Sequence, residues 1–240
     1  MTETISVDIV FANLADISNL GRLRARLSDN ERQRVDGYKV REPREVSLLA
    51  RALLRTELAR RVGVKPLDLS FDVRASGKPD LRHDDASIPD WRFSVSHTGP
   101  HVAIAFALGH DVGIDIERLD RLAEPLDIAT RFFTPKEVER LQSTPPGELH
   151  RTFFAGWTRK EAIVKARGIT MAESLATLSV DLAPGAQHPG YEEAPEVGER
   201  GRCRLTAFEI PGHRLMGAVA VLGDREPRLT LRMVSDETFD

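Results

Sequence analysis

The chain has 240 residues, of which 41% are hydrophobic and 30% are charged, and its formal net charge is −3. This is the composition of an ordinary soluble protein with one large or two small domains, and the negative balance argues against a nucleic-acid backbone as the main ligand. The single cysteine, Cys203, excludes an internal disulfide and any zinc cluster built from cysteines, and it fits a reducing compartment.

The N-terminal segment and the apolar runs carry no targeting or membrane signal. The first residues include acids instead of the basic and then apolar pattern of a secretion signal. No apolar run approaches the length that spans a bilayer. We therefore expect a cytoplasmic globular protein that binds neither membrane nor nucleic acid.

The first half of the chain mixes predicted strands with predicted helices. Strand patterns cover residues 6–14, 67–73, 92–97 and 101–108, and the last two are predicted to pair as a hairpin. The capping box Ser28-Asp-Asn-Glu31 opens a helix toward Tyr38. An amphipathic helix is predicted over Ser47 to Val62, with Gly63 as its stop, and Ser76-Gly-Lys-Pro79 is predicted to form a turn.

The second half begins with a predicted strand over residues 111–116. Thr134-Pro-Lys-Glu137 indicates a helix start, with threonine as the cap, proline first in the helix and glutamate three residues after the cap. A further helix is predicted from about Leu149 to Ala166, ending at Gly168. Residues 183–201 have the composition of an exposed loop, and 202–210 and 215–222 are predicted to pair. A weak similarity between the segments that begin at His101 and His213 suggests two similar α+β halves with a cleft between them.

Two carboxylates interrupt an apolar strand pattern in Val112-Gly-Ile-Asp-Ile-Glu117. Side chains alternate along a strand, so Asp115 and Glu117 share one face. Carboxylates on a common face are ligands that Mg²⁺ accepts together with phosphate and water. The alternative is a strand end whose acids face solvent, and the dipeptide alone leaves both interpretations open.

Trp157, Glu161 and Lys165 follow one another at the i, i+4 spacing of a helix and therefore share a stripe. Glu161 and Lys165 could equally form an ordinary surface ion pair, worth about 0.2–0.5 kcal/mol. Trp157 has the character of a core anchor. If this stripe meets Asp115 and Glu117, the site suits a magnesium-dependent phosphoryl- or phosphodiester-transfer enzyme.

Several residues of the first half could bind phosphate groups. Ser96-His97 ends an apolar strand, so His97 could bind a phosphate or hydrogen-bond its own turn. Lys78 could reach a phosphate as a point charge, whereas Arg34 and Arg51 could each lie on a solvated helix face. The sequence contains no Walker loop and no Gly-x-Gly-x-x-Gly, so it would not bind a nucleotide in either of those ways. It also lacks the Gly-x-Ser-x-Gly elbow of a serine hydrolase.

Taken in order, these motifs resemble the 4′-phosphopantetheinyl transferase superfamily, in the longer single-chain type that activates peptide and polyketide synthases (the surfactin-synthetase-activating type). The resemblance covers roughly residues 76–168 and the upstream helix 48–55. The matching motifs are Ser76-Gly-Lys-Pro79, Phe93-Ser-Val-Ser-His97, Val112-Gly-Ile-Asp-Ile-Glu117, Arg131-Phe-Phe-Thr-Pro-Lys-Glu137 and Trp157-Thr-Arg-Lys-Glu-Ala-Ile-Val-Lys165. Each motif is modest, but the ordered set is specific.

The resemblance implies an α+β fold of two similar mixed halves, related by a pseudo-twofold, with the active site in the cleft between them. The expected halves are residues 1–109, with contacts to the phosphates of coenzyme A, and residues 110–240, with the magnesium site and the catalytic helix. The family transfers the 4′-phosphopantetheine arm of coenzyme A to a serine of an apo acyl or peptidyl carrier protein. Adenosine 3′,5′-bisphosphate is released, and a monomer is expected.

The resemblance also implies roles for individual residues. Asp115, Glu117 and Glu161 would hold magnesium, Glu161 would act as the base for the carrier serine, and Lys165 would stabilise or protonate the departing phosphate. The implied coenzyme A contacts are Lys78, Ser96 (through its backbone), His97, Arg34 and Arg51. This chain departs from the family at position 31, where some members have a basic residue and this chain has Glu31, and near Arg44, where Val46 stands.

Two alternatives to a transferase remain at this point. A non-catalytic module of the same fold could bind coenzyme A or a carrier protein, although such a module has no reason to keep all three acids and Lys165. A metal-dependent phosphoesterase would need further metal ligands, which no histidine-rich cluster supplies. For the carrier we expect a surface in the segment Leu119 to Phe133, with Arg121 as a contact; the carrier's pathway is not indicated.

Overall fold

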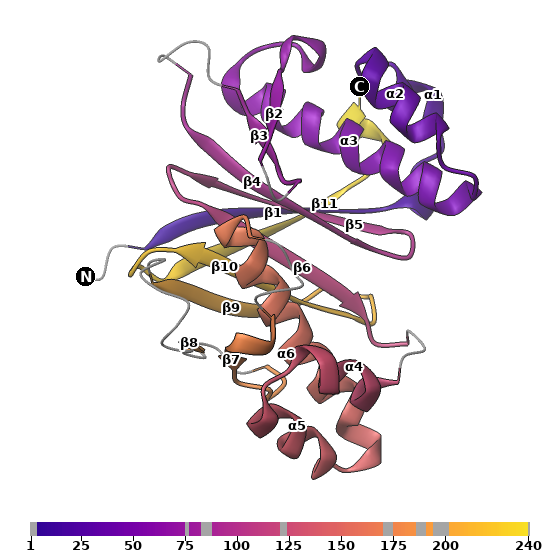
Figure 1. The fold of residues 1–240 in the computed structure, drawn as a ribbon. Helices are drawn as coiled ribbons and strands as arrows, with labels where there is room; N and C mark the ends of the chain where they lie inside the picture. The colour runs from indigo at the N-terminus through magenta and orange to yellow at the C-terminus, as the bar shows by residue number, and fades with distance from the viewer. Residues whose placement is uncertain are drawn as a thin grey trace. The chain divides into compact units, whose positions relative to one another are not determined.

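The computed structural model describes residues 4–74, 77–82, 88–120, 124–169, 175–185, 202–239 and the backbone of 191–193. The chain forms two compact units, each with one long helix, α3 or α6 (Figure 1). The N-terminal unit comprises Ser6–Gly109 and Leu229–Asp240, and the C-terminal unit comprises Met1–Ile5 and His110–Arg228. The fold is mixed α and β, as the sequence predicted.

The N-terminal unit is built on a four-stranded sheet in the order β11-β1-β5-β4. Its strands are β1 (Ile5–Asn13), β4 (Trp91–Thr98), β5 (His101–Leu108) and β11 (Pro227–Val234). β5 is antiparallel to both β1 and β4, which confirms the predicted hairpin around Gly99. Val10, Ile104 and Phe106 belong to the buried cluster that also contains the apolar residues of helix α3. Burial of this apolar face holds the helix on the sheet.

The helices of this unit begin and end at sequence signals. They are α1 (Leu20–Arg24), α2 (Asp29–Asp36) and α3 (Arg41–Val62), with short 3-10 turns η1 (Leu14–Asp16), η2 (Pro66–Asp68) and η5 (Asp236–Phe239). Ser28 and Glu31 form the predicted capping box of α2. α3 ends at Gly63 with φ +75°, as expected, but begins at Arg41, six residues before the predicted start. Pro43 is tolerated there because the first turn of a helix does not need every backbone N–H.

The strand predicted over residues 67–73 forms only in part. Its first residues belong to η2, and only β2 (Phe71–Val73) is a strand, paired with β3 (Pro79–Leu81). Pro66 at the start of the segment favours the helical turn over an extended chain. The intervening turn places Gly77 at φ +84°, where glycine has no steric penalty.

The C-terminal unit is built on a three-stranded antiparallel sheet in the order β6-β10-β9. Its elements are β6 (Val112–Arg118), α4 (Pro125–Phe132), α5 (Pro135–Gln142), α6 (Pro146–Arg167), η3 (Leu175–Thr177), β7 (Leu178–Val180), β8 (Tyr191–Glu193), β9 (Cys203–Glu209) and β10 (Leu215–Leu222). The predicted last hairpin, the Thr134–Glu137 capping box and the helix end at Gly168 are confirmed. Most of the loop predicted at 183–201 lies outside the described residues; within it, β8 pairs with β7.

The C-terminal segment differs from the expected domain boundary. The sequence assigned residues 110–240 to one half, but Leu229–Asp240 packs with the N-terminal unit. The reason is that β11, which the sequence analysis did not predict, adds to the free edge of β1. Arg232 of this strand pairs with the buried carboxylate of Glu57 at 2.6 Å, and Asp236 accepts two hydrogen bonds from the Ser18 backbone N–H at 3.0 Å.

A buried ion pair anchors α3 to its neighbours. The Arg55 guanidinium, which is 4% exposed, donates to Glu31 at 2.6 Å, the same glutamate that caps α2. It also donates to the carbonyls of Pro66 and Leu69, and its guanidinium lies 5.1 Å from the centre of the Phe71 ring. The acid at position 31 is therefore engaged within the fold, by the α2 cap and by Arg55.

A second buried ion pair anchors α6 in the same manner. The Lys160 ammonium has no exposed surface and pairs at 2.7 Å with Glu137, the glutamate that caps α5. It also donates to the carbonyls of Leu175 and Leu178, and it lies 4.8 Å from the centre of the Phe133 ring. Because every proton of this ammonium has an acceptor, the charge can remain inside the core.

Candidate functional site

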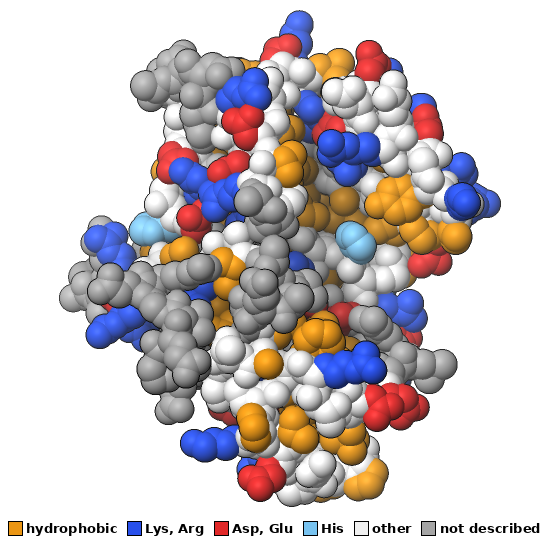
Figure 2. Space-filling view, in the orientation of Figure 1, with side chains coloured by type: hydrophobic (Ala, Val, Ile, Leu, Met, Phe, Trp, Pro, Cys, Tyr) orange, Lys and Arg blue, Asp and Glu red, His pale blue; other side chains and the backbone are white. Residues whose placement is uncertain are grey.

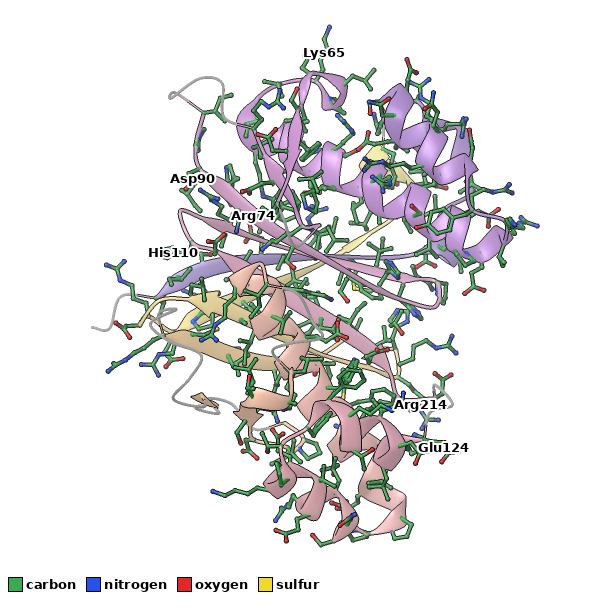
Figure 3. The ribbon with its side chains drawn as sticks, in the orientation of Figure 1. Lys65, Arg74, Asp90, His110, Glu124 and Arg214 are labelled. Carbon is green, nitrogen blue, oxygen red and sulfur yellow. The ribbon has the colours of Figure 1, made fainter. Side chains whose placement is uncertain are left out.

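Helix α6 offers one narrow accessible stripe. Over the stretch from Thr152 to Ala166, all of which the structure describes, every residue is buried except Trp157, Glu161 and Lys165. This helix packs against strands β6 and β10 of the same unit (Figure 3). The three accessible residues are those at i, i+4 spacing that the sequence singled out. An otherwise buried helix therefore presents a carboxylate and an ammonium side by side.

Asp115 and Glu117 occupy one face of β6, which forms the edge of its sheet. They lie opposite Ala218 and Met216 of β10, and they are only 3% and 7% exposed. The interpretation of a strand end whose acids face solvent is therefore wrong. Carboxylates so well removed from water need a compensating positive charge.

Lys165 supplies such a charge and joins the strand to the helix. Its Nζ lies 2.6 Å from Oδ1 of Asp115 and 3.4 Å from Oε2 of Glu161. Burial would lower the pKa of Lys165, but the two carboxylates outweigh burial and raise that pKa above its ordinary value. The interpretation of Glu161 and Lys165 as a mere surface pair is therefore incomplete, because Asp115 is the nearer partner of the lysine.

Glu161 binds protons more readily than an ordinary glutamate. Burial of its carboxyl and the adjacent charge of Asp115 raise its pKa to about 7, while Lys165 opposes the rise. Two carboxyls and one ammonium thus share a small volume, in which the Lys165 side chain is 25% exposed and the Glu161 side chain is 12% exposed. A group with a pKa near neutrality can both accept and release a proton under ordinary conditions.

The acids suit a hard cation in their chemistry, although they are not arranged as a finished metal site. Within the described parts of the chain, no three or more His, Cys, Asp or Glu side chains form a group that could hold a metal ion. Asp115, Glu117 and Glu161 nevertheless offer only carboxylate oxygens, the donors that Mg²⁺ prefers. Burial and, after it, the charge of Asp115 raise the pKa of Glu161, and a bound cation would offset both by favouring the ionised carboxylate.

A second set of predicted residues meets in the N-terminal unit. From Val46 to Ala59, a stretch that is fully described, only Ser47 and Arg51 of α3 are accessible. Arg51 lines a cavity of about 200 Å³ together with His97 of β4, Ser47 and Tyr38. The predicted pair Arg51 and His97 is thus brought together. Ser47 and Tyr38 were not singled out, although the i, i+4 spacing of Ser47 and Arg51 was visible in the sequence.

The other predicted coenzyme A contacts, Arg34, Lys78 and Ser96, lie in or near the elements that line this cavity and a neighbouring one. Arg34 and Arg51 both line a neighbouring cavity of about 410 Å³, so Arg51 borders both cavities. Lys78 precedes Pro79, which also borders both. Ser96 is buried while His97 is exposed, because consecutive residues of β4 point to opposite faces. Only the backbone of Ser96 can therefore accompany His97 on that face.

Charged side chains of both signs lie on the described parts of the face that Figure 2 shows. Figure 2 shows Lys and Arg side chains interspersed with Asp and Glu over the visible face. This arrangement fits local recognition of a small anionic ligand better than tracking of a polyanion. No helix in the described portion of the chain is long and apolar enough to cross a membrane.

Comparisons with known proteins identify the family. Residues 111–195 match the model of the 4′-phosphopantetheinyl transferase superfamily, and residues 17–108 match that of the 4′-phosphopantetheinyl transferase N-terminal region. The chain is 34% identical to the 4′-phosphopantetheinyl transferase HetI of Nostoc sp. over 70% of each chain. It is 32% identical to a 4′-phosphopantetheinyl transferase of Bacillus subtilis over 67% of this chain and 69% of that one, and 28% identical to Sfp of Bacillus subtilis over 79% and 80%. The chain belongs to the 4′-phosphopantetheinyl transferase superfamily.

Proposed function

We propose that this protein is a magnesium-dependent enzyme that transfers the 4′-phosphopantetheine arm of coenzyme A to a serine of an apo acyl or peptidyl carrier protein. Family membership supports the reaction class. The observation that carries the residue assignment is the convergence of Glu161 and Lys165, from the accessible stripe of α6, on the buried Asp115 of β6.

Asp115, Glu117 and Glu161 would hold the magnesium ion. When bound, the ion would neutralise charge that develops on the 5′-phosphate of the departing adenosine 3′,5′-bisphosphate. The two strand acids suit this role because they are buried and therefore fixed in place. Lys165, now close to Asp115, would remain as a second positive charge beside the phosphates.

Glu161 and Lys165 would move the protons of the reaction. As the serine oxygen bonds to the phosphorus next to pantetheine, its proton would pass to the Glu161 carboxylate. The bond between that phosphorus and the oxygen of the second phosphate breaks, and adenosine 3′,5′-bisphosphate leaves with the bonding electrons. Lys165 would stabilise this departing phosphate or give it a proton. Most of the rate enhancement would come from positioning and charge, as is usual in phosphoryl transfer.

The N-terminal unit would bind the phosphates of coenzyme A. Arg51 and His97 line one cavity, and Arg34 with Arg51 lines the next, so cationic groups border a continuous run of recessed surface. Lys78 and the Ser96 backbone would add contacts at its edge. Ser47 offers a hydroxyl beside Arg51, and a guanidinium with a neighbouring hydroxyl is a suitable pair for a phosphate.

For the carrier we propose a surface on helix α4. Leu126, Ile128 and Phe132 are only partly buried there, and Arg131 of the same helix is exposed. Apolar and basic groups together suit an acidic partner. Arg121, the carrier contact expected from the sequence, lies outside the described residues. Arg131→Glu therefore tests this surface, and it is expected to weaken carrier binding.

The rival function is a non-catalytic module that only binds coenzyme A or a carrier. The relatives are themselves 4′-phosphopantetheinyl transferases, which favours catalysis. The convergence of Asp115 and Glu161 on Lys165 favours catalysis as well, because a module that only binds has no reason to keep two acids and a lysine at one point. A cytoplasmic monomer remains our prediction for compartment and assembly.

Intact-protein mass spectrometry of an apo carrier protein, incubated with this enzyme, coenzyme A and magnesium, tests the proposal. We expect a mass gain of one phosphopantetheine that EDTA abolishes and added magnesium restores. Parallel reactions with peptidyl, acyl and aryl carriers identify the preferred client class. Binding of coenzyme A without any mass gain across these carriers would favour the binding module, and a gain that survives EDTA would contradict the magnesium requirement.

A further inference from the structure

Gly113 lies on the same face of β6 as Asp115 and Glu117, because alternate residues of a strand share a face. It is buried, and its backbone is in an ordinary strand, so no unusual φ requires a glycine there. The requirement is one of space. A Cβ at this position would stand 2.0 Å from the carbonyl oxygen of Ala162 and 2.4 Å from the backbone nitrogen of Ala166.

The contact is between two backbones, so no side-chain rotation can relieve it. Ordinary contacts of a Cβ begin at 3.4 Å, so a side chain at position 113 would move α6 away by about 1.4 Å, the difference between 3.4 and 2.0 Å. The two α6 residues in this contact are next to the charged residues in sequence. Ala162 directly follows Glu161, and Ala166 directly follows Lys165. The close approach is therefore made at the part of the helix that carries the charged stripe.

We infer that Gly113 is a positioning residue of this enzyme: its missing side chain sets how closely α6 lies on β6, and thereby brings Glu161 and Lys165 to Asp115. The 2.6 Å separation between Lys165 Nζ and Asp115 Oδ1 depends on that approach. This inference rests on the proposed function, because it assigns the close approach to catalysis and metal binding and not to folding alone.

A glycine of the same helix provides a matched control. A Cβ at Gly156 of α6 would meet Leu182 Cδ2 at 2.4 Å and Phe133 Cε1 at 2.8 Å. The overlap is again severe, but it involves side chains that can turn aside and does not involve β6. Gly156→Ala should therefore disturb packing around α6 without separating the helix from the strand that carries Asp115.

The experiment compares Gly113→Ala and Gly156→Ala with the wild type in three readouts. These are carrier transfer at varied magnesium, calorimetric binding of Mn²⁺ in the presence of coenzyme A, and thermal unfolding.

For Gly113→Ala we expect kcat to fall about 100-fold, the usual consequence of a misplacement near 1 Å. The half-saturating magnesium concentration and the Mn²⁺ dissociation constant should rise together, while the KM for coenzyme A should change less than threefold. Gly156→Ala should lower the unfolding temperature but keep kcat within about threefold of the wild type, since its overlap lies away from the reacting groups.

A rescue variant separates positioning from general damage. Asp115→Glu lengthens the carboxylate by one methylene and should impair the wild type. In the Gly113→Ala background the longer side chain reaches back toward the displaced helix, so it should recover about tenfold in kcat and tighten Mn²⁺ binding. A purely structural role for Gly113 predicts no such rescue. If Gly113→Ala is unfolded at the assay temperature, the same readouts are taken at a lower temperature with a stabilising osmolyte, where we expect the same changes relative to the wild type.

The outcomes distinguish the two proposals. Absence of transfer by the wild type would overturn the proposed function. Wild-type transfer together with a folded Gly113→Ala variant of unchanged kcat and unchanged Mn²⁺ affinity would overturn the positioning role alone. Equal losses of kcat and metal affinity in Gly113→Ala and Gly156→Ala would also overturn it, because the effect would then follow packing and not the approach of α6 to β6.

Discussion

The two long helices, α3 and α6, share an architecture but present different chemistry. Each has 22 residues and ends at a glycine in the left-handed region, Gly63 or Gly168. Each belongs to a largely buried helix–sheet core. The accessible residues of the central stretches differ: within residues 46–59 α3 presents Ser47 and Arg51, whereas within residues 152–166 α6 presents a tryptophan, a glutamate and a lysine. The same scaffold thus carries a predicted phosphate contact in one unit and the predicted reacting groups in the other.

The buried ion pairs extend this comparison. In each unit a capping-box glutamate pairs with a cation of the long helix, Glu31 with Arg55 and Glu137 with Lys160. The separations in sequence are 24 residues (55 − 31) and 23 residues (160 − 137). Each cation then donates to two carbonyls three residues apart and lies over an aromatic ring. These correspondences support two copies of one structural unit more strongly than the weak sequence similarity at His101 and His213 does.

The ion pairs also provide a common reference for the two helices. Trp157 and Glu161 stand three residues before and one residue after Lys160. The residues in the same places relative to Arg55 are Ala52 and Thr56, both of which are buried. The shared architecture therefore does not dictate a reactive stripe. At these two positions the helices differ both in residue type and in exposure.

The largest effect should come from Glu161→Gln. This change keeps the volume of the side chain but removes the carboxylate of the α6 stripe, so we expect kcat to fall by about 10²- to 10³-fold. Carrier transfer followed by mass spectrometry measures it, and circular dichroism monitors the fold. The control is Glu148→Gln, an exposed acid in the first turn of the same helix. Full activity of Glu161→Gln would refute the roles assigned to this residue.

Removal of a buried ion pair should cost stability in the unit that contains it. Glu137→Gln leaves the Lys160 ammonium, which has no exposed surface, without its counter-ion, and we expect a loss of about 3 kcal/mol in unfolding free energy. Glu31→Gln should cost less, because its side chain is 15% exposed and water can compensate. Urea unfolding measures both changes, with the exposed Glu139→Gln as control. Equal losses would show that the two pairs are not distinguished by burial.

Changes in the α3 cavity should affect binding of coenzyme A and not the chemical step. His97→Ala removes a cationic or hydrogen-bonding group from the cavity, so we expect the dissociation constant to rise about tenfold, equivalent to about 1.4 kcal/mol. Calorimetry measures the constant, and His110→Ala, outside the cavity, is the control. An unchanged constant in His97→Ala would remove this residue from the phosphate site.

The smallest effect at neutral pH is an acid sensitivity of the N-terminal unit. Burial opposes ionisation of Glu57, but hydrogen bonds from Arg232 and Arg61 outweigh it and lower its pKa below the ordinary 4.5. The stability from this carboxylate is therefore present above pH 4.5 and is lost as the pH falls through the lowered value. Unfolding measured across this range should show a shallower decline for Glu57→Gln than for the wild type. Parallel declines would contradict the assignment.

The sequence predicted the elements whose signals are local. The two hairpins, the capping boxes and the glycine stops each depend on a few neighbouring residues, and all are confirmed. Strand β11 was not predicted, because its pairing with β1 joins residues more than 200 positions apart. The early start of α3 was missed because a proline inside a helix pattern usually marks a break, whereas Pro43 lies in the first turn, where proline is tolerated.

The sequence indicated which candidate residues share a face, but not how deeply they are buried. The spacing of Asp115 and Glu117 indicated a shared face, yet their burial depends on the approach of α6, a tertiary contact that the local pattern does not contain. Lys160 provides another example, since a lysine inside a helix pattern indicates solvent by default. Its complete burial follows from Glu137 and two carbonyls that come from distant parts of the chain.

The central claim is that α3 binds coenzyme A while α6 carries out the transfer. The most direct test measures two quantities, the coenzyme A dissociation constant and the single-turnover transfer rate at saturating coenzyme A, for Arg51→Ala and Glu161→Gln. We predict that Arg51→Ala weakens binding about tenfold and leaves the rate within about threefold, whereas Glu161→Gln reduces the rate by at least about 100-fold and leaves binding nearly unchanged. Equal effects of both variants on both quantities would contradict the division of labour between the two helices.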